Sequence, residues 1–229
     1  MESRHDRLKS LIGENNLEKL KRAKVIVFGL GGVGGATIEA LARSGIGEIA
    51  VCDNDTFEPT NLNRQVLATE KTIGKSKVEV ALNRIAEIDK NIKTTGYDIF
   101  YLPETAHQIP LDNYDYIIDC VDTVTAKLHL VKQSKELNIP IISAMGTGNK
   151  LDPSQFRVAD LSETETCPLS RVMRAKLKKM EIDPKSVKVV FSPEQPLLKS
   201  RVPASNSTCP LVCGLIMANE VIADLMKGE

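Results

Sequence analysis

A glycine-rich turn near the start of the chain constrains its fold more than any other feature. Gly29, Gly31 and Gly34 have the spacing G-x-G-x-x-G and lie between an apolar run and a helix expected at residues 34–43. Glycine permits a tight turn and a close approach of phosphate, and the first N–H groups of the helix attract anions. Asp53 ends the next apolar run, where a carboxylate can accept hydrogen bonds from ribose hydroxyls. The pattern predicts a nucleotide site, with a ligand-free tight turn as the alternative.

Apolar runs alternate with amphipathic segments through the first two thirds of the chain. Parallel strands need crossover connections, so this alternation predicts an α/β fold with a doubly wound, mainly parallel Rossmann-like sheet and helices on both faces. The expected strands are residues 24–29, 48–53, 93–100, 114–120 and 140–146, and the helices between them are 34–43, 75–89 and 125–138. Ligands bind such sheets beyond the carboxyl ends of the strands.

The pattern changes after residue 146. Residues 155–161 and 187–192 are expected as antiparallel additions to the sheet, and a helix is expected at 167–180 between them. Residues 193–208 have no periodicity and predict a flexible loop. The remaining expected helices are a polar one at 5–22 and a closing one at 211–227.

The segment after Asp53 favours a triphosphate over NAD. Asn61, Arg64 and Lys77 are expected near the glycine turn, and two extra cations exceed what one pyrophosphate needs. Asp122 follows the fourth expected strand and could hold Mg²⁺ through its carboxylate. From spacing alone, ordinary solvated charge explains these cations equally well.

Composition narrows the functional class only modestly. The chain has 229 residues, with Lys+Arg and Asp+Glu both 30, so net charge gives no argument for nucleic acid. A charged N-terminus predicts no signal peptide, and the apolar run at 209–218 is too short to span a bilayer. Five cysteines without a secretory signal indicate reduced thiols, and hence a cytoplasmic protein without a membrane partner.

Several motifs in order resemble the adenylating enzymes related to ubiquitin-activating enzyme. These motifs are RHDR at 4–7, GLGGVG at 29–34, DNDTFEPTNLNRQ at 53–65, GKSK at 74–77 and DCVD at 119–122. The resemblance implies a single adenylating domain over 1–229, with an ATP-binding core at 1–146 and a part for substrate, tRNA and dimerisation at 147–229. It implies ATP contacts from Gly29, Gly31, Gly32, Gly34, Asp53, Asp55, Asn61, Arg64, Lys77 and Asp122, with Asp122 also holding Mg²⁺. Catalysis would use Arg64, Lys77 and Asp122, together with Arg7 reaching the ATP of the opposite subunit in a homodimer.

The second half of the chain separates branches of that superfamily. Activators of sulfur-carrier proteins commonly have two C-x-x-C pairs, whereas Cys209 and Cys213 are spaced C-x-x-x-C with no second pair. Residues 142–179 instead resemble the tRNA threonylcarbamoyladenosine dehydratases, which use ATP to cyclise a modification next to the anticodon. That resemblance implies ATP and Mg²⁺ as cofactors and tRNA as a partner, and leaves open a cysteine-desulfurase or sulfur-acceptor system. An adenylyltransferase for a ubiquitin-like sulfur carrier and a non-catalytic nucleotide-binding protein are the alternatives, and a dehydrogenase is more remote.

The expected helix at 167–180 has a basic stripe. Arg171, Arg174 and Lys178 fall on the face opposite its apolar side chains. Pattern alone favours a solvated face, whereas the resemblance favours contact with the tRNA backbone. Lys199 and Arg201 could add contacts. Cys167 begins this helix and is either reactive or, more often in such positions, structural.

Overall fold

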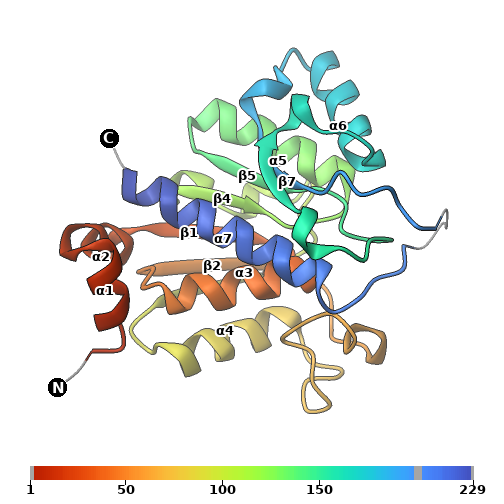
Figure 1. Cartoon of the computed structure of the whole chain (residues 1–229). Coiled ribbons are helices and arrows are strands. Elements are labelled where there is room, and N and C mark those ends of the chain that lie inside the picture. Colours follow the sequence, from red (N-terminus) through yellow and green to blue (C-terminus); the bar gives the residue numbers. More distant parts are fainter. Residues whose placement is uncertain (1–2, 199–202, 228–229) are drawn as a thin grey trace.

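The computed structural model describes residues 3–198 and 203–227. Its centre is one seven-stranded sheet with the strand order β3-β2-β1-β4-β5-β7-β6 (Figure 1). The strands are β1 (Lys24–Phe28), β2 (Glu48–Asp53), β3 (Lys93–Asp98), β4 (Tyr116–Asp119), β5 (Ile141–Ala144), β6 (Arg157–Asp160) and β7 (Lys188–Phe191). The predicted Rossmann-like sheet is confirmed.

The strand order changes direction between β1 and β4, which is where ligands bind in open α/β sheets. β1 pairs in parallel with β2 on one side and with β4 on the other. One orientation predicted from the sequence is wrong: β7 runs parallel to β5, and only β6 is antiparallel. A helix between β6 and β7 does not itself fix their relative direction, because β6 is an edge strand that can pair either way.

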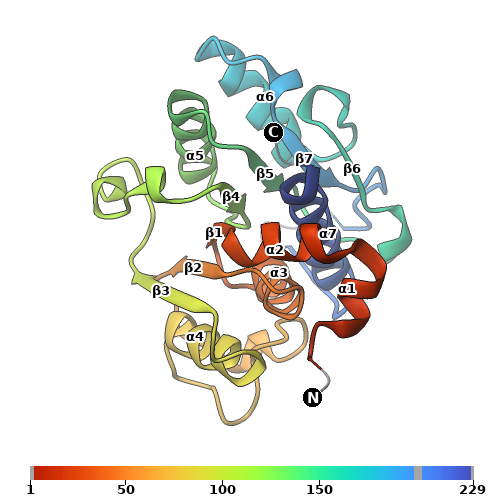
Figure 2. The same ribbon diagram turned by 90° about the vertical axis from the view of Figure 1, so that its left-hand side faces the viewer.

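Helices cover both faces of the sheet (Figure 2), and side chains alternate between two cores along the buried strands. On one face, Val25 and Val27 pack with α3 and α7; on the other, Ile26 and Phe28 pack toward α5. The helices are α1 (Asp6–Ile12), α2 (Glu14–Arg22), α3 (Gly32–Arg43), α4 (Lys77–Ile88), α5 (Val124–Leu137), α6 (Pro168–Lys179) and α7 (Cys209–Lys227). The single helix expected at 5–22 is instead two helices, because Gly13 takes a left-handed φ of 83° between α1 and α2.

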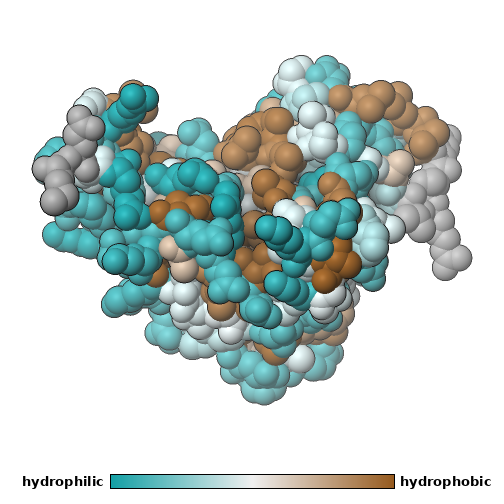
Figure 3. Space-filling model, turned by 90° about the horizontal axis from the view of Figure 1, so that it is seen from below, coloured by the Kyte–Doolittle hydropathy of each residue, from teal (hydrophilic) through white to brown (hydrophobic). Residues whose placement is uncertain are grey.

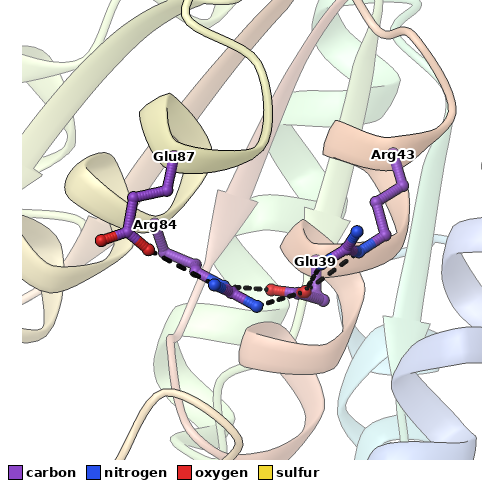
Figure 4. A network of polar contacts seen from close by, with 4 residues as sticks. All are labelled: Glu39, Arg43, Arg84 and Glu87. Carbon is purple, nitrogen blue, oxygen red and sulfur yellow. Dashed lines mark hydrogen bonds and ion pairs between the residues drawn. The ribbon is translucent and has the colours of Figure 1, made fainter. Parts of the chain in front are cut away.

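An arginine–carboxylate network fixes α4 against α3 (Figure 4). The guanidinium of Arg84 donates to both carboxylate oxygens of Glu39, at 2.8 Å and 2.9 Å, and Arg43 donates to the same carboxylate. Burial acts to raise the pKa of Glu39, but hydrogen bonds from Arg84 and Arg43 outweigh it and the pKa is lowered. Since α3 begins at the glycine turn and α4 begins at Lys77, this bidentate network holds two parts of the expected site in a fixed relation.

The last helix, α7, is long and apolar enough to cross a bilayer by the criteria of length and hydropathy, with 19 residues and a mean hydropathy of 1.6. In this fold it packs along α3, where a Cβ on Gly214 would overlap the carbonyl oxygen of Val33. Cys213, Met217 and Val221 are fully buried in the core between the two helices. The close crossing places the start of α7 against the glycine turn.

Candidate active site

A cavity of about 1150 Å³ opens at the carboxyl ends of the central strands. A first group of lining residues comes from the predicted nucleotide site: Gly29, Gly31, Gly32, Asp53, Asp55, Asn61, Arg64, Lys77 and Asp122. A second group comes from the later part of the chain: residues 146–150, 166–169, 195–196, 203–205 and 210. The same cavity therefore has room for a nucleotide and for a second molecule.

The glycines of the turn are required by close contacts. Gly29 has a φ of 84°, and a Cβ there would lie 2.8 Å from the carbonyl oxygen of Cys120. A Cβ on Gly34 would overlap the carbonyl oxygen of Gly29, so Gly34 closes the turn without lining the cavity. A Cβ on Gly32 would lie 2.8 Å from Pro210, the second residue of α7. The turn is thus packed against the end of β4 and the start of α7.

Asp53 is held in place by the turn that it faces. Its Oδ2 accepts a 2.5 Å hydrogen bond from the backbone N–H of Leu30, and its Oδ1 accepts one from the N–H of Asp55. The carboxylate is only half-buried and lines the cavity. It therefore keeps acceptor capacity for ribose hydroxyls, as predicted from its place at the end of β2.

The predicted phosphate-binding residues gather at one part of the cavity wall. Lys77 is buried at the start of α4, and its Nζ donates to Asp55 Oδ2 at 2.9 Å. The guanidinium of Arg64 donates a hydrogen bond to the carbonyl of Thr60 at 2.7 Å. The side chain of Asn61 is occupied by a capping contact, accepting from the N–H of Glu58. Two cations therefore line the same cavity as the glycine turn.

The carboxylate of Asp122 is of the kind that binds Mg²⁺ in proteins. It is exposed on the loop between β4 and α5, and it lines the cavity. Among the described residues there is no group of three His, Cys, Asp or Glu side chains that could hold a metal. One carboxylate suits Mg²⁺, which usually takes one or two protein carboxylates and completes its shell with phosphate oxygens and water.

Other predicted residues lie outside the cavity wall. Arg7 is exposed on α1, which packs on α2 at the end of the molecule where α7 finishes (Figure 1). On α6, Arg171 and Lys178 are exposed, whereas Arg174 is half-buried and donates to the carbonyl of Thr164 at 2.7 Å. Part of the basic stripe thus has a structural contact. Lys199 and Arg201 lie outside the described residues.

The cavity also has a wall that sequence reasoning missed. Ile99, Phe100 and Tyr101 follow β3 and line it together with Val121 and Ala126. Tyr101 is buried and bonds to His129 Nδ1 at 3.0 Å, and burial raises the pKa of its phenol, so it stays neutral. An apolar wall beside the carboxylate of Asp53 suits a purine base. No local motif marks these residues, because only the strand order brings them beside Asp53.

Gln65 is a second residue that the sequence prediction passed over. Its side chain is buried and lines the cavity next to Gly31, with its Nε2 lying 3.8 Å from where a Cβ on Gly31 would stand. Its Oε1 has no hydrogen-bond partner among the described residues. A buried amide without a partner is costly, and a ligand or water in the cavity can satisfy it.

Beneath the site lies a fully buried ion pair, also unexpected. Lys127 donates to Asp119 at 2.9 Å, to Ser143 at 3.1 Å and to the carbonyl of Ala144 at 2.7 Å. Ser143 also donates to Asp119, at 2.5 Å. The ammonium thus satisfies all its donors and has a carboxylate to balance its charge. The group ties the ends of β4 and β5 to α5.

The cysteines near the site are mostly buried thiols. Burial raises the pKa of Cys52 and of Cys120 to about 12, as expected for packed core thiols. Cys209 and Cys213 are buried at the start of α7. Cys167 is buried at the start of α6 and lines the cavity.

Residues 193–208 are irregular, but the described parts are fixed by contacts with Asn149. Its carbonyl accepts from Leu197, its N–H donates to Ala204, and its side chain accepts from the N–H of Ala204. Asn149 and Thr166 both have positive φ, 60° and 59°, and both line the cavity. A positive φ is unusual for a β-branched threonine, and such conformations cluster at functional sites.

Comparison with known proteins settles the family. The ThiF family model matches residues 3–228. Over 94% of this chain and 92% of the other protein, the sequence is 42% identical to the tRNA threonylcarbamoyladenosine dehydratase of Bacillus subtilis (strain 168). This chain belongs to the ThiF family, among the tRNA threonylcarbamoyladenosine dehydratases. The resemblance inferred from the motifs is therefore confirmed.

Solved structures agree with this membership of the ThiF family. The structure of the Escherichia coli tRNA N6-threonylcarbamoyladenosine dehydratase TcdA in complex with ATP is 32% identical, with a TM-score of 0.91 over 98% of this chain and 94% of that one. A shorter match, 37% identical over 58% of this chain and 30% of the other, is to the Vanderwaltozyma polyspora protein named adenylyltransferase and sulfurtransferase UBA4.

Proposed function

We propose that this protein uses ATP to dehydrate and cyclise threonylcarbamoyladenosine in tRNA. The observation that carries the proposal is the single cavity in which the glycine turn, Arg64 and Lys77 share a wall with residues 146–150. Such a cavity can hold a triphosphate and an acid together. Support comes from the dehydratase relative at 42% identity and from the ATP-bound neighbour.

The reaction follows from bringing a carboxylate to a phosphate. An oxygen of the threonine carboxylate attacks the α-phosphorus of ATP, and pyrophosphate leaves with the electrons of the broken P–O bond. A nucleophilic atom of the same modification then attacks the activated carbonyl and releases AMP. The net change is loss of one water from the modification, whose oxygen ends in AMP. Positioning and charge neutralisation supply most of the rate enhancement in such a scheme.

Residues of this chain have separable parts in that scheme. Arg64 and Lys77 offset the negative charge on the departing pyrophosphate, and the N–H groups at the start of α3 donate hydrogen bonds to phosphate oxygens. Asp53 accepts from the ribose, which sets the α-phosphate relative to the turn. Asp122 would hold Mg²⁺, which when bound neutralises phosphate charge and polarises the P–O bonds.

A homodimer with Arg7 acting in trans is the proposed assembly, and α7 supports it. This helix runs from the cavity, which Pro210 lines, to the α2 end, where Lys19 donates to the carbonyl of Met226. Its 19 residues span about 28 Å. A two-fold axis across the middle of α7 would carry α1 of one subunit to the cavity of the other. Arg7 itself lies on α1, which packs on α2 near the end of α7 that is away from the cavity, and it does not line the cavity of its own chain.

The outer side of α7 offers a surface for such a contact. Leu215 is 49% exposed, and Ile216 and Ile222 are partly exposed on the same helix. Seen from below, apolar side chains gather in a hollow on the side of the molecule where α1 and α7 lie (Figure 3). A second copy of this chain would cover these side chains.

tRNA would meet the protein on the α6 side of the cavity. Arg171 and Lys178 are exposed there, while Cys167 and Leu169 from the start of the same helix line the cavity. A phosphate backbone that follows the exposed face can therefore deliver a modified base to the opening.

Five free cysteines accord with a reducing, cytoplasmic setting.

A second function has one observation in its favour. The match to UBA4 makes adenylation of a sulfur-carrier protein the alternative. That activity would expose the same α-phosphate to the C-terminus of a protein rather than to tRNA.

Mass spectrometry of nucleosides tests the proposal against this alternative. Modified tRNA is incubated with protein, with and without ATP, and its nucleosides are analysed. Loss of one water from threonylcarbamoyladenosine only with ATP supports the proposal. If tRNA is unchanged while a carrier protein ending in Gly-Gly stimulates ATP–pyrophosphate exchange, the alternative holds. The Lys77→Met variant controls for activity carried by contaminants.

A further inference from the structure

Lys150 is a buried cation in the cavity wall, and within the described part of the chain its ammonium forms no ion pair with a carboxylate. The residue is 5% exposed, and its Nζ donates to the carbonyls of Ser192 at 3.2 Å and Glu194 at 2.5 Å. Among the described residues, Nζ bonds to these carbonyls and to no carboxylate. An ammonium has three N–H donors, so one remains for another acceptor.

The contrast with Lys127 shows that this arrangement is particular to the cavity. Lys127 is also buried, but Asp119 lies 2.9 Å from its Nζ and balances its charge. Lys127 lies beneath the site, whereas Lys150 lines the cavity. A buried ammonium that forms no ion pair is costly, and an anion that enters the cavity and pairs with it reduces that cost.

The carboxylate nearest in sequence to these carbonyls is engaged elsewhere. Glu194 accepts hydrogen bonds from the N–H groups of Leu151 at 2.9 Å and Asp152 at 3.1 Å. Its side chain therefore caps the backbone that follows Lys150 instead of pairing with the ammonium. Thr166, with its positive φ, donates to the carbonyl of Pro193 and fixes the same segment from the other side.

The backbone of Lys150 is also tied to the nucleotide side of the cavity. Its carbonyl accepts from the thiol of Cys209 at 3.4 Å, and the next residue, Pro210, packs against Gly32 of the glycine turn. The cation is thus anchored through α7 to the turn that would receive the phosphates. It lies apart from Arg64 and Lys77, which belong to the segments before and within α4.

We infer that Lys150 binds the carboxylate of the acid substrate and holds it for attack on the α-phosphate of ATP. This inference rests on the proposed function and names the residue that recognises the acid. A carboxylate approaching a triphosphate meets strong repulsion, which a cation on the acid side offsets. Lys150 needs no proton transfer for this part, only its charge.

Charge at Lys150 depends on its surroundings in a testable way. Burial lowers the pKa of Lys150, while Cys167, Glu194 and Cys209 act in the opposite direction. The ammonium is present below that pKa and is lost as pH rises through it. Binding of the acid should therefore weaken at alkaline pH, below the range in which an exposed lysine loses its proton.

Steady-state kinetics with modified tRNA test the inference. In Lys150→Met, the KM for modified tRNA should rise tenfold or more, while the dissociation constant for ATP stays within twofold of wild type. In wild type, the KM for tRNA should rise at alkaline pH, and this inflection should disappear in Lys150→Met but persist in Cys167→Ser. Lys150→Arg should recover part of the lost affinity.

Lys135→Met is the control outside the cavity. Lys135 is exposed on α5, its Nζ also donates to a backbone carbonyl, that of Ser186, and it does not line the cavity. This variant should leave both constants unchanged. If Lys150→Met keeps the wild-type KM for tRNA, or weakens ATP and tRNA equally without changing the pH profile, the inference is wrong. Wild type that fails to act on tRNA would instead refute the proposed function.

Discussion

The carbonyl oxygen of Gly214 in α7 lies 3.1 Å from the hydroxyl oxygen of Thr37 in α3. The two helices cross so closely that a Cβ on Gly214 would overlap the carbonyl of Val33 and lie 2.9 Å from the Cβ of Ala36. Because α3 begins in the glycine turn, the last helix of the chain supports the nucleotide site from behind. A substitution that disturbs this crossing should therefore lower the stability of the fold and weaken ATP binding.

Gly214→Ala should destabilise the protein by roughly 2 kcal/mol, because overpacking against backbone atoms outweighs the gain in helix propensity. Urea unfolding measures the loss, and ATP titration should show weaker binding. Gly35→Ala is the control: the atoms nearest to its new Cβ would be side-chain atoms of Val66 and Leu67, the first at 3.3 Å, and no backbone atom lies as close. Equal stability of the two variants would contradict the close crossing.

Lys77→Met should lower kcat/KM by roughly 100-fold or more, the scale for losing one charge-stabilising donor in an active site. The fold should persist, because the ion-pair partner Asp55 is 62% exposed and can be solvated when Lys77 is lost. Activity and thermal unfolding are measured together. Lys75→Met alters an exposed lysine of the same segment and should keep near wild-type activity. A fully active Lys77→Met enzyme would remove Lys77 from the mechanism.

The pair Asp119 and Lys127 should behave as a unit. Lys127→Met leaves a buried carboxylate uncompensated and should cost about 3–5 kcal/mol of stability. Adding Asp119→Asn to that variant removes the unpaired charge and should restore part of the loss. Denaturant unfolding of the two single variants and the double variant gives the coupling energy. Additive losses in the double variant would show that the two residues act independently.

Asp224 gives the fold a dependence on pH at the far ends of the strands. Burial acts to raise its pKa, but hydrogen bonds from Lys188 at 2.6 Å and Tyr116 at 2.8 Å outweigh it, and the pKa is lowered. The stability this carboxylate contributes is therefore present above the ordinary Asp pKa of about 3.9 and is lost as pH falls through the lower folded value. The difference in stability between wild type and Asp224→Asn should be constant near neutral pH and shrink in acid. A difference that stays the same at pH 3 would contradict this.

The sequence predicted those parts of the site that are local. Gly29, Gly34 and Asp53 could be assigned because a turn and two strand ends carry them within 25 residues. Lys127 and Lys150 could not, because burial of a lysine depends on partners such as Ser143 and Ser192 that only the folded chain brings near. Gly13 lay inside a helical pattern, and nothing in composition distinguished a tolerated glycine from one at a positive φ.

Strand order explains most of the remaining misses. The Ile99–Tyr101 segment lies beside Asp53 because β3 pairs with β2, and β7 is parallel because it joins the sheet at β5. Neither pairing leaves a periodic signal in the sequence. The basic stripe on α6 was predicted from periodicity alone, which cannot reveal that Arg174 would bond to Thr164.

Mixed dimers test whether Arg7 acts across subunits. Arg7→Ala and Lys77→Met should each be inactive alone, because each homodimer lacks one required cation in both sites. In a mixed dimer, the Arg7→Ala subunit keeps its own Lys77 and receives Arg7 of the partner subunit, so one site is complete. Random mixing makes half the dimers mixed, with one working site each, and should restore roughly a quarter of wild-type activity. If Arg7 acted within its own chain, each mixed dimer would contain two damaged sites and mixing would restore nothing, which makes recovered activity after mixing the decisive readout for the two-fold arrangement across α7.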